Sequence, residues 1–156
     1  MQKKKLKDIY GLELPRKPTP LGAIFSFTRR VGNLLYVTGQ IPTYNDELLF
    51  TGRLGADFTI EQGQQAARYC MLNLLAIIKD ELNGFEKIDQ FVNLLGFVQS
   101  TDDFHNQTQV MNGASQMLID LFGDEIGRPI RMAIGSNALP MNAPVEIMLM
   151  VELKSN

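Results

Sequence analysis

Alternating apolar and polar residues near the C-terminus predict two β-strands, over 131–138 and 145–154. One side of the second run is continuously apolar and marks a core face, made of Val145, Ile147, Leu149, Val151 and Leu153. Its other side carries Met148 and Met150 between two carboxylates, which is unusual for a solvated face. We therefore expect another copy of the chain to cover that side. The two runs, joined by a proline-containing connection, are predicted to form a β-hairpin.

The same pattern predicts strands at Ala23–Val31, Leu34–Ile41 and Ile88–Ser100. The first two flank Gly32-Asn33, a two-residue connection that is typical of a tight hairpin. The third run is apolar on both sides, which indicates a central strand buried on both faces. Its two sides are expected to be Val92, Leu94 and Val98 against Phe91, Leu95 and Phe97.

Two runs with apolar residues every three or four positions predict helices. Thr59 and Gln62 form a capping-box sequence at the start of the first run, and Asn83-Gly84 supplies a left-handed stop after it. Its apolar stripe is Ala67, Cys70, Met71, Leu74, Leu75, Ile78 and Leu82. The second helix is predicted to end at Gly123, and its stripe is Val110, Ala114, Met117, Leu118 and Leu121.

This order of elements predicts an α+β fold, in which one mixed sheet carries two helices on one face. The other face is then left open, so we expect the chain to oligomerise through its sheet. The domain is predicted over residues 21–156, and residues 1–20, rich in lysine and proline, are predicted to be an N-terminal extension. A solvated end is the favoured interpretation of the lysines, with binding to RNA or another anionic surface as the alternative.

The composition is that of one globular domain. The chain has 156 residues, of which 45% are hydrophobic and 21% charged. Its net charge of −2 gives no general attraction to nucleic-acid phosphates. One cysteine forms no internal disulfide, and the sequence has neither a signal-peptide apolar region nor an apolar run of roughly 20 residues. We therefore expect a cytoplasmic protein without a membrane or nucleic-acid partner.

Common catalytic motifs are missing. The sequence contains no Cys-x-x-Cys, His-x-x-x-His or Gly-x-Ser-x-Gly, and neither of the glycine-rich nucleotide motifs. Cys70 lies in an apolar helical stripe and is interpreted as a core residue. The lone His105 lies in a polar turn and is interpreted as a surface residue, with a catalytic role as the alternative. No metal or dinucleotide cofactor is expected.

Arg131 is the clearest candidate for binding a ligand. It shares one side of a predicted strand with Ala133 and Gly135, and small neighbours beside a long cation leave room for a ligand. A guanidinium fork suits a carboxylate or phosphate. A structural ion pair with Glu146 or Glu152 is an equally good interpretation of this arginine.

Thr38 and Gly39 end a predicted strand. A threonine hydroxyl and nearby backbone N–H groups can hold a polar ligand atom there, and glycine permits close approach of the backbone. An ordinary β-branched strand residue is the other interpretation of Thr38.

Two motifs together resemble the Rid family of YjgF-type reactive intermediate deaminases, also known as the endoribonuclease L-PSP family. They are Arg131, Leu139-Pro140 and Val145-Glu146 near the C-terminus, and Gly32–Pro42, which ends in Thr-Gly-Gln-Ile-Pro. The similarity spans residues 21–154, and Asn112–Ser115 and Glu61–Gly63 point to a longer, less characterised branch. The resemblance implies a chorismate-mutase-like homotrimer with sites in clefts between subunits.

The resemblance also implies roles for single residues. Arg131 matches the arginine that binds the substrate carboxylate, Glu146 the carboxylate that positions water, and Thr38 a position that is often serine. Asn112 matches an asparagine that lines the cleft, and Gly39 is expected to be another substrate-binding residue.

Two substrate-binding positions depart from the family pattern. Ala133 stands where the family commonly has cysteine, a change that enlarges the pocket. Phe25 stands where the family has tyrosine, and the loss of that hydroxyl leaves the identity of the substrate open.

Imine hydrolysis fits this set of residues. Arg131 would clamp the carboxylate of a 2-imino acid while Glu146 orients a water, as in a deaminase of 2-iminobutanoate or 2-iminopropanoate. Both side chains share a cleft if the hairpin places odd residues of its first arm with even residues of its second. A non-catalytic trimer that binds small carboxylates is the alternative function, and a ribonuclease or translation inhibitor ranks third.

Overall fold

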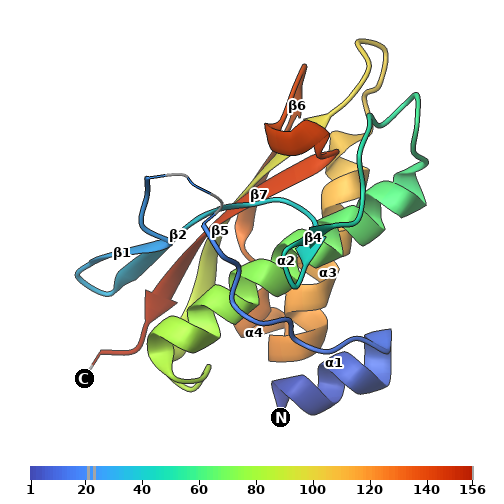
Figure 1. Ribbon diagram of the computed structural model, residues 1–156. Coiled ribbons are helices and arrows are strands. Elements are labelled where there is room, and N and C mark those ends of the chain that lie inside the picture. Colours follow the sequence, from blue (N-terminus) through green and yellow to red (C-terminus); the bar gives the residue numbers. More distant parts are fainter. Residues whose placement is uncertain (21, 23, 156) are drawn as a thin grey trace.

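The computed structural model describes residues 1–20, 22 and 24–155. Leu21, Ala23 and Asn156 lie outside the described residues, and with them the first residue of the predicted strand at 23–31 and both ends of the predicted domain. The elements, shown in Figure 1, are α1 (Gln2–Tyr10), β1 (Thr28–Val31), β2 (Leu34–Gln40), β3 (Thr43–Tyr44), β4 (Glu47–Leu48), α2 (Ile60–Leu82), β5 (Ile88–Gln99), α3 (Gln107–Phe122), α4 (Asp124–Gly127), β6 (Ile130–Ser136), the 3₁₀ turn η1 (Pro140–Asn142) and β7 (Val145–Leu153).

Five strands form the main sheet, in the order β1-β2-β7-β5-β6. β5 and β6 run parallel, whereas the other neighbouring pairs are antiparallel. The long helices α2 and α3 lie together on one side of this sheet (Figure 1). The predicted α+β fold, a mixed sheet with two helices on one face, is therefore confirmed.

The predicted C-terminal hairpin is wrong. β6 and β7 are both strands, but β5 lies between them and pairs with each. The connection at 137–144 contains η1 and crosses the end of β5, instead of turning tightly between neighbouring strands. Alternation identifies a strand and its two faces, but it carries no information about which strand becomes the neighbour.

The helix predictions are confirmed. Thr59 caps α2 with the reciprocal bonds of a capping box, since its hydroxyl accepts from the Gln62 N–H and the Gln62 side chain accepts from the Thr59 N–H. Asn83 ends α2 in the left-handed conformation, and α3 ends before Gly123. All the apolar residues predicted for the two stripes are buried.

β5 contains two irregularities in its pairing with β7, one of which lies between Phe91 and Asn93. This extra residue inverts the alternation, so Phe91 and Leu94 both point into the core, together with Val98. The predicted division of β5, with Phe91 opposite Leu94, is therefore wrong. Leu95 and Phe97 lie on the other face and are only partly buried.

The sheet face away from the helices is partly apolar. Met148 and Met150 are half-buried on β7, as the alternation predicts. On the edge strand β6 the same face carries Ile130, Met132 and Ile134, which are 71%, 55% and 39% exposed. Side chains of this kind in a row on an edge strand are typical of an interaction surface.

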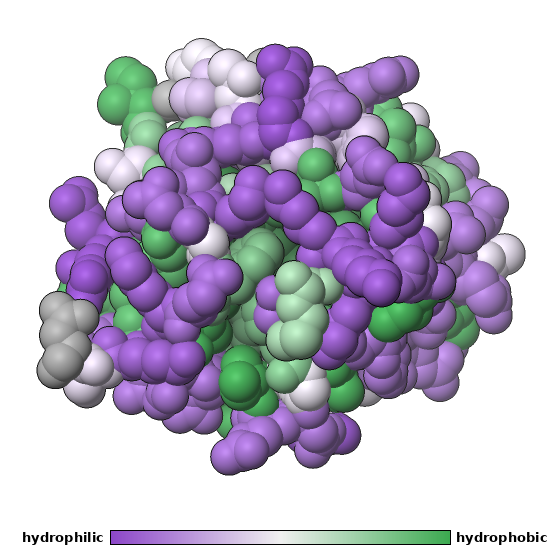
Figure 2. Space-filling model, turned by 90° about the horizontal axis from the view of Figure 1, so that it is seen from below, coloured by the Kyte–Doolittle hydropathy of each residue, from purple (hydrophilic) through white to green (hydrophobic). Residues whose placement is uncertain are grey.

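The N-terminal helix α1 is docked on the fold through α3. Leu6 is buried, Lys5 donates to the carbonyl of Leu121 over 3.2 Å, and Tyr10 donates to Asp120 over 2.5 Å. Ile9 on the same helix is 51% exposed. The end of the molecule that carries α1 is mostly hydrophilic, with small separate hydrophobic areas (Figure 2). None of the described helices has the length and hydropathy required to cross a membrane.

Candidate functional site

Arg131 extends from β6 toward α3, on the helix-covered side of the sheet. Its Nη1 donates to Asn112 Oδ1 and to Ser115 Oγ, both over 3.0 Å, and its Nη2 donates to the carbonyl of Thr108 over 3.2 Å. Partial burial lowers the pKa of Arg131 from its ordinary value. The structure thus brings together Arg131 and Asn112, two predicted site residues that are 19 positions apart.

Arg131 makes no ion pair with a carboxylate of the described chain. Glu152, one of the two predicted partners, instead accepts a hydrogen bond from Gln90 over 2.6 Å. Glu146, the other, lies on the opposite face of the sheet. The structural ion pair considered for Arg131 is therefore excluded within one chain, and the guanidinium retains its charge for an external anion.

A hollow of about 320 Å³ lies beside Arg131. Its lining residues are Asn112, Ser115, Gln116, Ile119, Arg128, Pro129 and Arg131. Arg128 was not identified from the sequence and adds a second cation, although it is paired with Asp124. Ala133 does not line this hollow, because its small side chain packs against the core. We call this region the arginine half-site.

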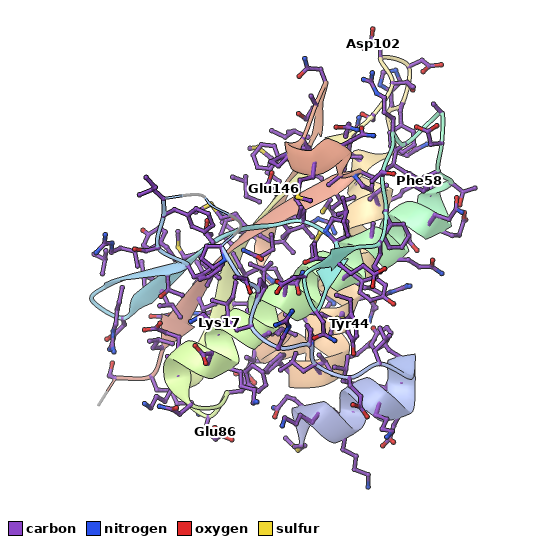
Figure 3. The ribbon with its side chains drawn as sticks, in the orientation of Figure 1. Lys17, Tyr44, Phe58, Glu86, Asp102 and Glu146 are labelled. Carbon is purple, nitrogen blue, oxygen red and sulfur yellow. The ribbon has the colours of Figure 1, made fainter. Side chains whose placement is uncertain are left out.

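Glu146 extends from the start of β7 on the open side of the sheet (Figure 3). The carboxylate lies against Gly39, where a Cβ would collide with it. A bulge between Val37 and Gln40 of β2 brings this backbone close to β7. Gly39 therefore permits a close approach of backbone and carboxylate, which is what its place at the end of a strand predicts.

The Glu146 carboxylate has neither a hydrogen-bond partner nor an ion-pair partner among the described residues. Partial burial raises its pKa above the ordinary value for glutamate, because a poorly solvated carboxylate favours its neutral form. A carboxyl group with a raised pKa is better suited to taking up and returning a proton than an ordinary solvated carboxylate.

A second hollow, of about 310 Å³, lies beside Glu146. Its lining residues are Pro18, Thr19, Pro20, Phe25, Phe27, Gly39, Gln40, Ile41, Thr43, Asp46, Pro140, Met141 and Glu146. Phe25 and Gly39, both predicted site residues, are thus beside Glu146. Thr38 lies in the same bulge but does not line the hollow, and its N–H donates to the carbonyl of Phe27 over 2.9 Å. We call this region the glutamate half-site.

The two half-sites do not meet within one chain. In the sheet, Arg131 is level with Leu94 and Leu149, which point into the core beneath the helices. Glu146 is level with Phe97, which lies on the open face. The register that would place Arg131 and Glu146 in one cleft of a single chain is therefore not present, and this part of the prediction is wrong. A shared site requires two copies of the chain.

Cys70 and His105 line neither half-site. Cys70 is buried, its Sγ donates to the carbonyl of Val145 over 3.6 Å, and burial raises the pKa of the thiol well above its ordinary value. His105 is exposed. In the part of the chain that the structure describes, no three His, Cys, Asp or Glu side chains cluster as metal ligands would.

Comparisons with known proteins agree with this fold. A family model described as "YjgF/chorismate mutase-like, putative endoribonuclease" matches residues 5–153. Protein TCP17 of Trypanosoma cruzi is 37% identical over 145 residues, which are 93% of this chain and 90% of that protein.

Two solved structures are similar over nearly the full length. The protein Atu1372 of Agrobacterium tumefaciens, described as of unknown function, is 38% identical with a TM-score of 0.90, over 99% of this chain and 92% of its own. A "putative endoribonuclease" of Shewanella oneidensis is 32% identical with a TM-score of 0.91, over 98% and 99% of the two chains. The chain therefore belongs to the YjgF/chorismate mutase-like family, which is the Rid family that its two sequence motifs resemble.

Proposed function

We propose that the protein is an imine deaminase, which hydrolyses 2-imino acids and their enamine tautomers to 2-keto acids and ammonia. The observation that carries the proposal is a pair of unmatched charges. Arg131 has no carboxylate partner and Glu146 has no cationic partner among the described residues, although each is partly buried beside a hollow. Partly buried charges without a partner are typical of sites that bind a ligand.

The catalytic site is proposed to form between copies of the chain in a homotrimer. Arg131 and Glu146 lie on opposite faces of the sheet, so an arginine half-site has to meet a glutamate half-site of a neighbouring copy. The exposed apolar residues Ile130, Met132 and Ile134 of the edge strand support such an assembly.

In the proposed reaction Arg131 holds the substrate carboxylate through a charge-assisted pair of hydrogen bonds. Glu146 takes a proton from water as the water oxygen bonds to the imine carbon, and it delivers this proton to the imine nitrogen, which gives a neutral carbinolamine. The carboxylate then takes the proton of the carbinolamine hydroxyl and passes it to the amino group, so that the C–N bond breaks as the C=O bond forms, and the products are ammonia and the keto acid. Glu146 ends the cycle as it began, so one water is consumed for each ammonia released.

Other predicted residues take supporting roles in this proposal. Asn112 accepts a hydrogen bond from Arg131 and so orients the guanidinium. Thr38 lies in the β2 bulge next to Gly39, and its hydroxyl is proposed to hold water or substrate at the edge of the glutamate half-site. Ala133 lies on the same side of β6 as Arg131 but packs against the core, so it is given no part in the reaction.

A non-catalytic carboxylate-binding protein would use the same two half-sites, and turnover separates the two functions. Imines generated freshly by an amino-acid oxidase are supplied to the protein, and the release of ammonia and keto acid above the uncatalysed rate is measured. We expect turnover by the parent chain and its loss in Arg131→Ala, with Arg29→Ala as a matched control because Arg29 is an exposed arginine outside both hollows. Absence of turnover on every imine would leave the binding function.

A further inference from the structure

The glutamate half-site has a strongly apolar lining, which bears on the class of substrate. Phe25, Phe27, Ile41 and Met141 line it together with three prolines. Phe25 and Phe27 contact each other edge to face, with ring centroids 5.4 Å apart. A second aromatic or aliphatic group packs favourably against rings arranged in this way.

The polar residues of the same lining are largely occupied by contacts within the chain. Asp46 accepts hydrogen bonds from the Thr19 N–H over 2.9 Å and from the Thr19 hydroxyl over 2.8 Å, and it pairs with Arg16 over 2.8 Å. Gln40 donates its amide to the carbonyl of Gly39 over 2.9 Å. The Asp46 contacts hold the 16–20 segment against the fold, and the Asp46 carboxylate has little capacity left for a ligand.

Thr43 is engaged in the same manner, because its hydroxyl accepts from Asn73 over 2.8 Å. Glu146 is therefore the one charged side chain of this lining without an internal partner in the part of the chain that the structure describes. A ligand group that enters the hollow next to the reacting carbon meets mainly carbon atoms. A polar group would be desolvated there without compensation.

Met141 occupies an unusual backbone position at this wall. Its φ is +56°, in the left-handed region that a side chain other than glycine or asparagine rarely adopts. Conformations of this kind are strained and cluster at ligand-binding sites. Here the turn at η1 places a flexible apolar side chain, 53% exposed, in the same hollow that Phe25 lines.

The hollow is large compared with a small alkyl group. Its volume of about 310 Å³ is roughly ten times the share of one water molecule in liquid water, and a methyl group is close to a water in size. The one- and two-carbon side chains of 2-iminopropanoate and 2-iminobutanoate would leave most of this space to water.

We propose that the glutamate half-site selects 2-imino acids with large apolar side chains, of four or more carbons or with a phenyl ring. This inference rests on the proposed function, since it concerns the substrate class of the same site. The carboxylate is held by Arg131 of one copy, the reacting carbon lies by Glu146 of the next, and the side chain lies between Phe25 and Met141.

A chain-length series tests the inference. Imines are generated from alanine, 2-aminobutyrate, norvaline and norleucine, and from phenylalanine, and kcat/KM is measured for each. Each added methylene that is buried is expected to raise kcat/KM about fourfold, the equivalent of ~0.8 kcal/mol, so the norleucine imine should exceed the alanine imine by about 60-fold. Imines that are all hydrolysed at similar rates, or faster when smaller, would overturn the inference while leaving the deaminase activity intact.

Variants locate the effect. Phe25→Ala and Met141→Ala should flatten the chain-length dependence of kcat/KM. Ile24→Ala is the matched control, because Ile24 is a fully exposed apolar neighbour of Phe25 that does not line the hollow. An unchanged slope in Phe25→Ala and Met141→Ala would refute the location.

A binding measurement covers the case in which no imine is turned over. The 2-keto acids of the same chain lengths are used as ligands in thermal unfolding, where their protection should rise with chain length in the parent and not in Phe25→Ala. Loss of turnover with this protection retained would refute the proposed deaminase alone. Equal protection by all chain lengths would refute the substrate class.

Discussion

Two inactive variants should restore each other if Arg131 and Glu146 act in one site from different copies. Within one chain the two side chains lie on opposite faces of the sheet, so neither variant can complete its own site. In a mixed trimer of Arg131→Ala and Glu146→Gln chains, one of the three contacts pairs an intact arginine with an intact glutamate. We therefore expect mixed trimers to show about one third of the parent activity.

The activity of each separate variant should be low enough for the restored activity to be measured above it. Removing a general acid–base lowers the rate about 10²–10⁴-fold, so Glu146→Gln alone should retain about 1% or less. Losing two charge-assisted hydrogen bonds to the substrate carboxylate costs about 3 kcal/mol, which is roughly 150-fold in kcat/KM for Arg131→Ala. A signal of one third is therefore at least about 30-fold above either parent variant.

The assay uses chains that carry different affinity tags. The two variants are co-expressed, mixed assemblies are isolated on both tags in turn, and ammonia release is measured from a freshly generated imine. As a comparison for the number of intact sites, chains that carry both substitutions are co-assembled with parent chains. Mixed assemblies as inactive as the separate variants, while the parent is active, would refute a site shared between copies.

Four further predictions concern the two charged residues and the open face of the sheet. Partial burial raises the pKa of Glu146, so the pH profile of kcat/KM should fall on its acidic side at a pH above the ordinary carboxyl range. A fall at the ordinary carboxyl pKa would show that Glu146 is not the base. Because the pKa of Glu146 is higher in the folded than in the unfolded chain, the free energy of unfolding falls as pH rises from the ordinary carboxyl pKa to the raised one. Glu146→Gln should therefore unfold at a higher temperature than the parent at neutral pH, and at the same temperature at pH values below the ordinary carboxyl range. Small carboxylic acids at 100 times their dissociation constant should stabilise the parent by about 2.7 kcal/mol, whereas their neutral amides should not, and equal protection would contradict the Arg131 clamp. Met150→Glu should dissociate the assembly in sedimentation, because a buried unpaired charge costs about 3–5 kcal/mol, whereas Gln65→Glu on an exposed part of α2 should not; a monomeric parent chain at micromolar concentration would contradict assembly through the sheet.

Local patterns in the sequence determined most of the secondary structure. The capping box at Thr59, the stop at Asn83 and the apolar stripes of α2 and α3 were all readable, because a helix depends on contacts within four residues. The alternating run at 145–153 identified both the buried face of β7 and the unusual methionines on its other face. The motifs around Arg131 and Glu146 indicated the family, which the family model confirms.

Long-range pairing was decided only by the tertiary structure. β5 is placed between β6 and β7 by contacts that span more than 30 residues in sequence, and no local pattern records that choice. The bulge near Phe91 shows the same limit within a strand, because a single extra residue inverts which side chains reach the core.

Long-range strand pairing also separates the predicted site residues. Their chemistry was readable from the sequence, but whether Arg131 and Glu146 share a face depends on the order and register of three strands. The apolar hollow beside Glu146 was equally hidden, since its walls come from the 18–20 segment, Phe25, Phe27 and the turn at Met141. The sequence thus determined that an arginine and a glutamate are available for the proposed reaction. The fold decided that one chain holds them on opposite faces of the sheet, because strand register sets which face each side chain takes and successive residues alternate between faces.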